Sequence, residues 1–286
     1  MKVVVDCSPG KSFPAVSVTG KSCDLRCDHC RGKHLESMVQ AMTSEDLHNI
    51  ASKIKLERGK GVLLSGGCDI NGTVPLLDHV DDIVEISKLG LEINAHSGFI
   101  SEKEAKDLVS AGIDCFSVDV HQDPDVISSV FHLKKTDADY ADLLGIIMSV
   151  GGKVVPHLTV GFGTYDLRQS AMLVKEKGFV DVVLNSLVPT EGTIAGDAFL
   201  SEDAILSAVD MLQKIGLDIT LGCMRDRSLR GLEIKCIEKG ITRIANMSQT
   251  AKKWAADNGY IIFTDNRCCC MGIDQKNESF CSESNP

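Results

Sequence analysis

Residues 13–30 read FPAVSVTGKSCDLRCDHC, a short apolar run that leads into three closely spaced cysteines. The apolar and β-branched residues of Phe13–Thr19 predict a strand. Cys23, Cys27 and Cys30 follow it in the spacing C-x3-C-x2-C. In a barrel of alternating strands and helices the carboxyl ends of the strands carry the chemistry, so we expect these thiols at the active face.

The same alternation of short apolar runs and amphipathic stretches continues outward from this segment. Further strands are predicted at Gly61–Leu64, Leu91–Asn94, Cys115–Val120, Lys153–Val160, Asp181–Leu187, Asp218–Leu221, Thr242–Asn246 and Tyr260–Phe263. Helices are predicted at Asp81–Leu89, Ser101–Ser110, Asp137–Val150, Asp166–Lys177, Ser201–Ile215, Leu229–Lys239 and Thr250–Asn258.

About eight strand–helix units predict an α/β fold, a (β/α)8 TIM-type barrel with parallel strands. A doubly wound open sheet gives the same alternation, and spacing alone does not separate the two. We expect residues 1–264 to form the barrel domain. Residues 265–286 are expected to form a cysteine-bearing extension that packs on the barrel mouth or stays flexible.

The composition is that of an ordinary globular chain, with 43% hydrophobic and 24% charged residues among 286. Lys plus Arg number 30 and Asp plus Glu 40, and the net charge of −10 argues against nucleic-acid or anionic-membrane binding. No stretch reaches the roughly 18 apolar residues of a membrane span, so we expect a soluble, cytoplasmic protein. In that compartment, twelve cysteines indicate metal binding or catalysis rather than disulfides.

The three cysteines of the opening stretch are suited to an iron–sulfur cluster. Three thiolates on one tight loop bind three irons of a [4Fe–4S] cluster and leave the fourth iron open. The alternative is a zinc site, in which His29 or His34 supplies the fourth ligand.

This spacing resembles that of the radical S-adenosylmethionine (SAM) superfamily. The resemblance implies that the open iron binds SAM and that Cys23, Cys27 and Cys30 are catalytic. It also places His29 near the adenine. Ser65-Gly66-Gly67-Cys68-Asp69 ends the second predicted strand and resembles the Gly-Gly-Glu motif whose backbone binds the methionine amino group, with Cys68 in place of the usual acid.

The resemblance extends to three further strand ends. His96 and Ser97 end the third strand and Asp119 the fourth, and they are expected to approach the carboxylate and ribose of SAM. A hydrogen-bonded structural role for His96 remains an equal alternative. Thr159 and Gly161 resemble the strand that flanks the adenine, although a single glycine is a weak signal.

A second set of cysteines comprises Cys223, Cys268, Cys269 and Cys270. Cys223 follows the seventh predicted strand, and the other three follow the last one. Three adjacent thiols are poor core residues, so we expect an auxiliary [4Fe–4S] cluster; inert thiols in the tail are the alternative. Cys115 and Cys236 are interpreted as small buried hydrophobic residues.

Over most of its length the chain resembles the biotin synthase-like group of the superfamily, and within it the octanoyl-acting component of the two-protein lipoyl synthase. The matching stretches include Phe13–Met38, Val155–Gly161, Pro189–Thr193 and Gly222–Arg225. This resemblance implies a sulfurtransferase of lipoate biosynthesis that uses the auxiliary cluster as sulfur donor.

The implied partners are an octanoylated carrier or lipoyl-domain protein, a companion radical SAM protein and an electron donor such as ferredoxin. Biotin synthase takes the cysteine ligands of its auxiliary cluster from mid-barrel strands. In this chain the ends of those strands carry His96, Asp119 and Thr159 instead, which disfavours biotin synthesis. Other radical SAM reactions of cofactor biosynthesis, a methyltransferase among them, remain open. A metal-binding protein without enzymatic activity is the remaining alternative.

Overall fold

The computed structural model describes residues 2–196 and 200–273 of the chain. Its strands are β1 (Lys2–Cys7), β2 (Ala15–Ser17), β3 (Val39–Gln40), β4 (Gly61–Ser65), β5 (Glu92–Ala95), β6 (Cys115–Asp119), β7 (Val154–Val160), β8 (Asp181–Ser186), β9 (Asp218–Leu221), β10 (Arg243–Ala245) and β11 (Tyr260–Asp265). Its α-helices are α1 (Ser44–Leu56), α2 (Val80–Lys88), α3 (Glu102–Ala111), α4 (Asp137–Ser149), α5 (Thr164–Glu176), α6 (Glu202–Ile215), α7 (Leu232–Glu238) and α8 (Gln249–Asp257).

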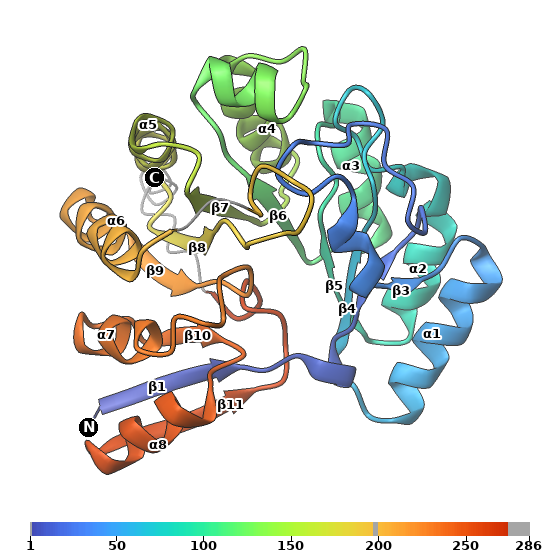
Figure 1. Ribbon diagram of the computed structural model, residues 1–286. Helices are drawn as coiled ribbons and strands as arrows, with labels where there is room; N and C mark the ends of the chain where they lie inside the picture. The colour runs from blue at the N-terminus through green and yellow to red at the C-terminus, as the bar shows by residue number, and fades with distance from the viewer. Residues whose placement is uncertain (1, 197–199, 274–286) are drawn as a thin grey trace, which may run out of the picture.

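The strands form one parallel sheet in the order β11-β1-β10-β9-β8-β7-β6-β5-β4-β2-β3. The sheet curls with the helices outside it (Figure 1), and the predicted α/β TIM-like fold with parallel strands is confirmed. Strand pairing within the described residues does not close the curl, because β11 and β3 are its two edges. The fold is therefore an open barrel.

Three elements were absent from the prediction. β1 (Lys2–Cys7) inserts between β10 and β11, in a segment for which no strand was predicted. Its three consecutive valines are strand-forming residues. Helix α1 and the two-residue strand β3 were also missed, even though a capping box of Thr43 and Asp46 marks the start of α1.

The predicted helix at residues 101–110 is confirmed as α3. The side chain of Ser101 accepts a hydrogen bond from the backbone N–H of Glu104, and the Glu104 side chain accepts one from the backbone N–H of Ser101. This reciprocal cap satisfies two backbone donors at the helix start. It fixes the connection that runs from the end of β5 into the helix layer.

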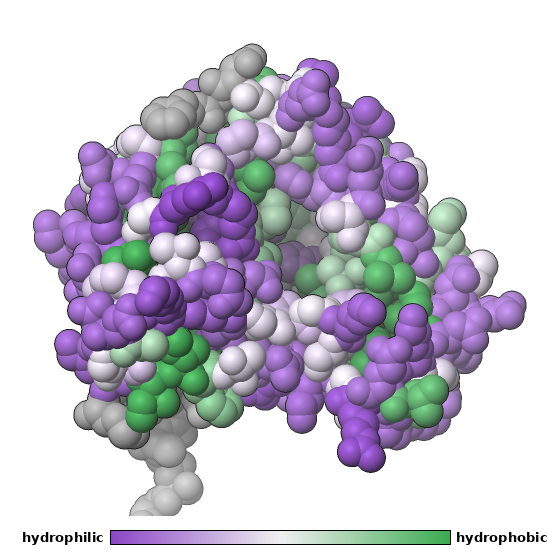
Figure 2. All heavy atoms as spheres, turned by 60° about the horizontal axis from the view of Figure 1, so that its bottom comes forward, coloured by the Kyte–Doolittle hydropathy of each residue, from purple (hydrophilic) through white to green (hydrophobic). Residues whose placement is uncertain are grey.

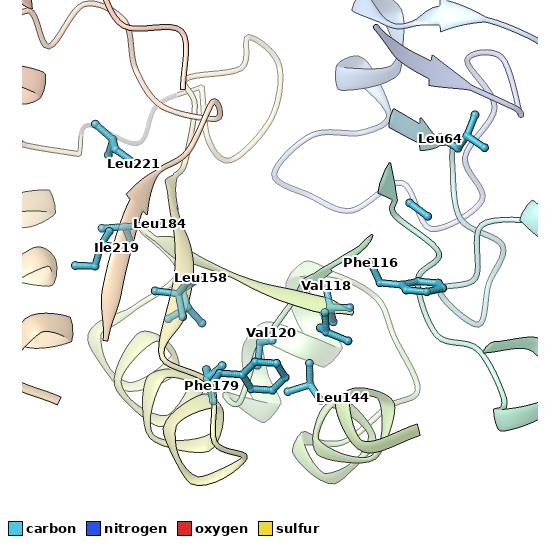
Figure 3. Packing of buried hydrophobic residues seen from close by; sticks show 14 of the residues in the cluster. Leu64, Phe116, Val118, Val120, Leu144, Leu158, Phe179, Leu184, Ile219 and Leu221 are labelled. Atoms are coloured by element: carbon cyan, nitrogen blue, oxygen red, sulfur yellow. The ribbon is translucent and has the colours of Figure 1, made fainter. Parts of the chain in front are cut away.

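Alternation along the strands divides the core into two parts. On β7, Val154 and Leu158 belong to the large core between sheet and helices, whereas Val155 belongs to a smaller one inside the curl. Figure 3 shows Leu144 and Phe179 beside Val120 in the large core. The smaller core contains Cys269, Cys270, Met271 and Ile273.

The extension predicted at residues 265–286 is thus described as far as residue 273, where it packs inside the curl. Residues 274–286 lie outside the described residues. Figure 2 shows that one face of the molecule is hollowed near its centre. Among the described helices, none is long and apolar enough to cross a membrane.

Candidate functional site

The loop that carries Cys23, Cys27 and Cys30, here called the triad loop, leaves the end of β2 and is held at two points. The backbone N–H of Asp24 donates to Cys68 O at 2.9 Å, just past the end of β4. The N–H of Asp28 donates to Val130 O at 2.9 Å. These bonds fix the three cysteines at the carboxyl ends of the strands, where the sequence placed them.

The three thiols differ in their surroundings. Cys27 is buried, whereas Cys23 and Cys30 are partly exposed. A hydrogen bond from the Cys27 thiol lowers the pKa of Cys30 to about 4, so Cys30 is the first of this pair to become a thiolate. Since thiolate is the ligand form for iron and zinc alike, the loop is suited to hold either metal.

The zinc alternative has partial geometric support. The ligand atoms of His29, Cys30 and His34 lie within 4.8 Å of one another in the described part of the chain. The loop chemistry alone therefore does not separate zinc from iron.

Gly66 and Gly67 follow β4 and pack against the triad loop. The N–H of Gly67 donates to Thr19 Oγ1 at 2.6 Å. A Cβ on Gly67 would lie 1.9 Å from Ser22 O and 2.6 Å from Cys23 Cα, so only glycine allows this approach. The strand end and the first cysteine are thereby held in direct backbone contact.

The two residues after the glycines have different roles. Cys68 borders the cavity described next, and burial raises the pKa of its thiol to about 12, so it stays neutral. Asp69 accepts hydrogen bonds from the N–H groups of Asn71 and Thr73 and stabilises its own turn. Neither residue supplies a carboxylate to the cavity.

An open cavity of about 840 Å³, the main cavity, lies between the triad loop and the ends of β4, β5 and β6. Six of the predicted site residues line it: Cys27, His29, Ser65, Gly66, His96 and Asp119. His96 Nδ1 lies 4.0 Å from Asp119 Oδ2. The aromatic residues Phe99, Phe131 and Tyr140 form much of the remaining wall.

A second cavity of about 550 Å³, the side cavity, adjoins the first. His29, Asp119 and Phe131 border both, and Thr159 lines the side cavity. Asn185 and Ser186 at the end of β8 also line it, and the sequence reasoning missed them. Their position as polar residues ending a buried strand was the available signal.

Three buried polar atoms at the side cavity lack a hydrogen-bond partner within the described residues: His29 Nδ1, Asn185 Oδ1 and Ser186 Oγ. Buried polar atoms are rarely left unpaired, because the loss of water costs free energy. An adenosyl group carries donors and acceptors that suit these atoms. The side cavity therefore fits the nucleoside part of SAM.

Two predicted residues stand apart from both cavities. The Ser97 hydroxyl donates to Gly98 O at 3.1 Å, and Ser97 is absent from either lining. Gly161 borders a different cavity, together with Gly163 and Thr164. A Cβ on Gly161 would lie 2.8 Å from the Leu187 side chain, so this glycine permits close packing behind the side cavity.

A buried hydrogen-bonded pair, His121 and Asp166, supports the wall beside His29. His121 Nδ1 lies 2.9 Å from Asp166 Oδ2, and both side chains are buried. Burial acts to raise the pKa of Asp166, but hydrogen bonds from His121 and from backbone N–H groups outweigh it and lower the pKa. The His121 ring packs on Phe131, which in turn packs on His29.

The second cysteine set comes together inside the barrel. The sulfurs of Cys223 and Cys269 interact, as do those of Cys268 and Cys269. Cys270 Sγ lies 3.3 Å from Cys268 Sγ. Hydrogen bonds from Cys269 and Cys270 lower the pKa of Cys268. Four sulfurs from two distant segments thus form one group.

Two other cysteines lie beside this group. Cys115, the first residue of β6, interacts with Cys270, so it is not remote from the predicted chemistry. Cys7 on β1 accepts a hydrogen bond from Arg243 at 3.2 Å and faces Cys268. Cys236 is buried in the large core, in agreement with its interpretation as a hydrophobic residue.

The sequence profile of the radical SAM superfamily matches residues 17–175. This is more than half of the chain, and the protein therefore belongs to the radical SAM superfamily. Membership implies a [4Fe–4S] cluster and SAM.

Curated relatives include biotin synthases from Neisseria meningitidis serogroup C and Haemophilus ducreyi, which are 26% and 25% identical over 191 residues. Each alignment covers 64% of this chain and 54% or 57% of the relative. The chain thus spans about half the length of these relatives.

Solved structures with a similar fold include methylornithine synthase PylB and the hydrogenase maturase HydG from Carboxydothermus hydrogenoformans. Their TM-scores are 0.62 and 0.64, with 16% and 15% sequence identity. The first match covers 87% of this chain and 74% of that structure, and the second 91% and 67%. At this identity the similarity concerns the fold.

Proposed function

We propose that this protein inserts sulfur into a protein-bound octanoyl chain, as one component of a two-protein lipoyl synthase. The observation that carries the proposal is the group formed by Cys223, Cys268, Cys269 and Cys270 inside the barrel. When bound, the triad cluster and SAM would supply a 5′-deoxyadenosyl radical, at the expense of one electron from the external electron donor, and this radical would take one hydrogen from a substrate carbon. An auxiliary [4Fe–4S] cluster would supply the sulfide for the new C–S bond, and its iron would take up the one electron released as that bond forms.

The donor set fits an auxiliary cluster. Thiolates are the ligands that iron–sulfur clusters require, and four sulfurs lie together, with Cys269 and Cys270 buried, Cys268 partly buried and Cys223 exposed. Adjacent thiols of the tail supply ligands from one segment, and Cys223 supplies one from the end of β9. A group of free thiols packed this closely would otherwise contribute little to the core.

The position of the group also fits sulfur insertion. Ser117 lines the main cavity, and its hydroxyl lies 3.3 Å from Cys270 Sγ. One side-chain layer therefore separates the floor of the cavity from the sulfurs. Such proximity lets a reacting carbon meet its sulfur before side reactions occur.

The residues of the main cavity bind an acyl chain and exclude water in this proposal. Phe99, Phe131, Tyr140 and Leu143 provide apolar wall, and Asp119 and His96 provide polar groups for the ribose and carboxylate of SAM. The proposed partners are an octanoylated carrier or lipoyl-domain protein, a companion radical SAM protein and an electron donor such as ferredoxin.

Iron analysis after anaerobic reconstitution tests the cofactor content. Two [4Fe–4S] clusters predict about eight irons per chain. The double change Cys223→Ala with Cys269→Ala should lower this to about four, whereas Cys236→Ala, a buried cysteine of the large core, should leave eight. Four irons in the unchanged protein would remove the sulfur-donor role.

The activity test is incubation with SAM, a reductant and an octanoyl-lysine peptide, followed by mass analysis for added sulfur. The unchanged protein should add sulfur, and the Cys223→Ala, Cys269→Ala protein should still cleave SAM without adding it. A protein with eight irons that cleaves SAM but never modifies the peptide would contradict the octanoyl substrate.

Sulfur insertion in biotin synthesis is the second candidate, because the curated relatives named above are biotin synthases. In this chain, β5, β6 and β7 carry Asn94, Ser117 and His157 on their inner faces, with Cys115 as their one cysteine. Replacing the peptide in the same assay with the sulfur-free precursor of biotin separates the two candidates.

A further inference from the structure

Two buried polar side chains lie between the main cavity and the sulfurs. Asn94 on β5 is 0% exposed and Ser117 on β6 is 3% exposed. Asn94 Nδ2 donates to Cys270 Sγ at 2.9 Å and to Cys268 Sγ at 3.5 Å. Neither residue belongs to the site predicted from the sequence.

Ser117 contacts the carbonyl end of the Asn94 amide. Its hydroxyl donates to Asn94 Oδ1 at 3.0 Å. The carbonyl end lies at Ser117 and the NH2 end points toward Cys268 and Cys270, whose sulfurs accept as thiolates when they bind a cluster. The pair therefore presents N–H donors, and not a carbonyl oxygen, to the two sulfurs.

An asparagine at this position is costly unless its polar atoms are paired. The neighbouring inner-face residues include Cys115 and Val155, which are buried and apolar. An amide with no exposed surface is tolerated only when it is hydrogen-bonded. Here the partners of the amide nitrogen are two sulfurs from the other end of the chain, so the pairing is specific to the folded tail.

We propose that Asn94 is a positioning residue for the auxiliary cluster, and that Ser117 fixes its orientation. The inference rests on the proposed function, since it requires a cluster at Cys268 and its neighbours. N–H groups aimed at thiolate sulfurs offset negative charge, which favours the reduced cluster and slows the loss of its ligands.

The test uses the full chain with both clusters reconstituted, and compares Asn94→Leu with Ile93→Val. Ile93 is the adjacent residue on β5, is equally buried and belongs to the large core. Asn94→Leu should lose the auxiliary irons to a chelator about 10–100-fold faster than the unchanged protein. Its auxiliary midpoint potential should shift to a more negative value.

Ser117→Ala should also speed the loss of the auxiliary irons and lower the auxiliary midpoint potential, but by smaller amounts than Asn94→Leu. The reason is that the Asn94 amide is then free to rotate. In all three variants the triad cluster should keep its spectral response to SAM. Ile93→Val should match the unchanged protein.

Suppose that the unchanged protein holds eight irons and that Asn94→Leu keeps the same rate of iron loss and the same auxiliary midpoint potential. That result would leave the proposed function standing and overturn this inference. Equal loss of both clusters in Asn94→Leu would also overturn it, because the effect would then be general damage to the fold. Only four irons in the unchanged protein would overturn the proposed function and this inference together.

Discussion

Gly67→Ala is the change whose effect follows most directly from the structure. Gly67 does not adopt a left-handed φ, so alanine meets no backbone penalty there and the cost is steric. The added Cβ would lie 1.9 Å from Ser22 O, whereas real Cβ contacts essentially never fall under 3.0 Å. The carbonyl must therefore retreat by at least about 1.1 Å, and Cys23 must move with it.

A displacement of this size sets the expected magnitude. Misplacing a reacting group by about 1 Å costs roughly 100-fold in rate. That factor corresponds to about 2.7 kcal/mol of activation free energy. We also expect a loss of about 1–3 kcal/mol in unfolding free energy from overpacking.

The assay compares SAM cleavage in the anaerobically reconstituted Gly67→Ala protein with that of Gly145→Ala. Gly145 lies within α4, where an added Cβ has only Lys177 Nζ near it, at 4.0 Å. The control should be neutral or more stable by about 0.5–1 kcal/mol, with normal cleavage. A Gly67→Ala protein with full iron content and unchanged SAM cleavage would refute the reasoning.

Three further changes have defined outcomes. Asp166→Ala should lower the unfolding free energy by about 3–5 kcal/mol in chemical denaturation, because it leaves His121 and the N–H groups of Gln122 and Asp123 without their acceptor. The pKa of Asp166 is lowered in the fold, so its contribution should be constant above about pH 5 and shrink as the pH falls below its ordinary value of 3.8. Ser186→Ala should weaken SAM binding about 2–12-fold in a titration, as expected for one lost hydrogen bond. An unaltered dissociation constant would show that Ser186 does not bind the nucleoside. Cys23, Cys27 and Cys30 changed together to alanine should abolish SAM cleavage, and cleavage that persists would contradict the role of the triad.

Much of the fold could be predicted from local sequence patterns. The alternation of strands and helices predicted the parallel sheet, and the cap at Ser101 predicted the start of α3. The pattern could not predict that β1 lies between β10 and β11, because the pairing of chain ends is a long-range property. It also could not show whether the curl closes, since closure depends on which strands meet at the edges.

Some residues of the candidate site could likewise be predicted from the sequence, and others could not. The triad and the Ser65–Gly67 turn were identified because their residues are adjacent in sequence and lie directly after strands. Asn185 and Ser186 were missed, because a polar residue at a strand end gains meaning only when a cavity is seen beside it. Ser97 was expected in the cavity, but its hydroxyl bonds to the neighbouring backbone.

The sequence by itself determined the superfamily, because the spacing of the three thiols that resembles it lies within eight residues of one loop. Only the tertiary structure decided that Cys115, Cys223 and Cys270 lie in one place, since they come from separate strands and the tail. The same holds for Asn94 and Ser117, whose contacts with the sulfurs arise from residues more than 150 positions apart. The spacing of neighbouring residues can be taken from the sequence directly. Contacts between residues far apart in the sequence form only after the sheet has curled and the tail has packed inside it.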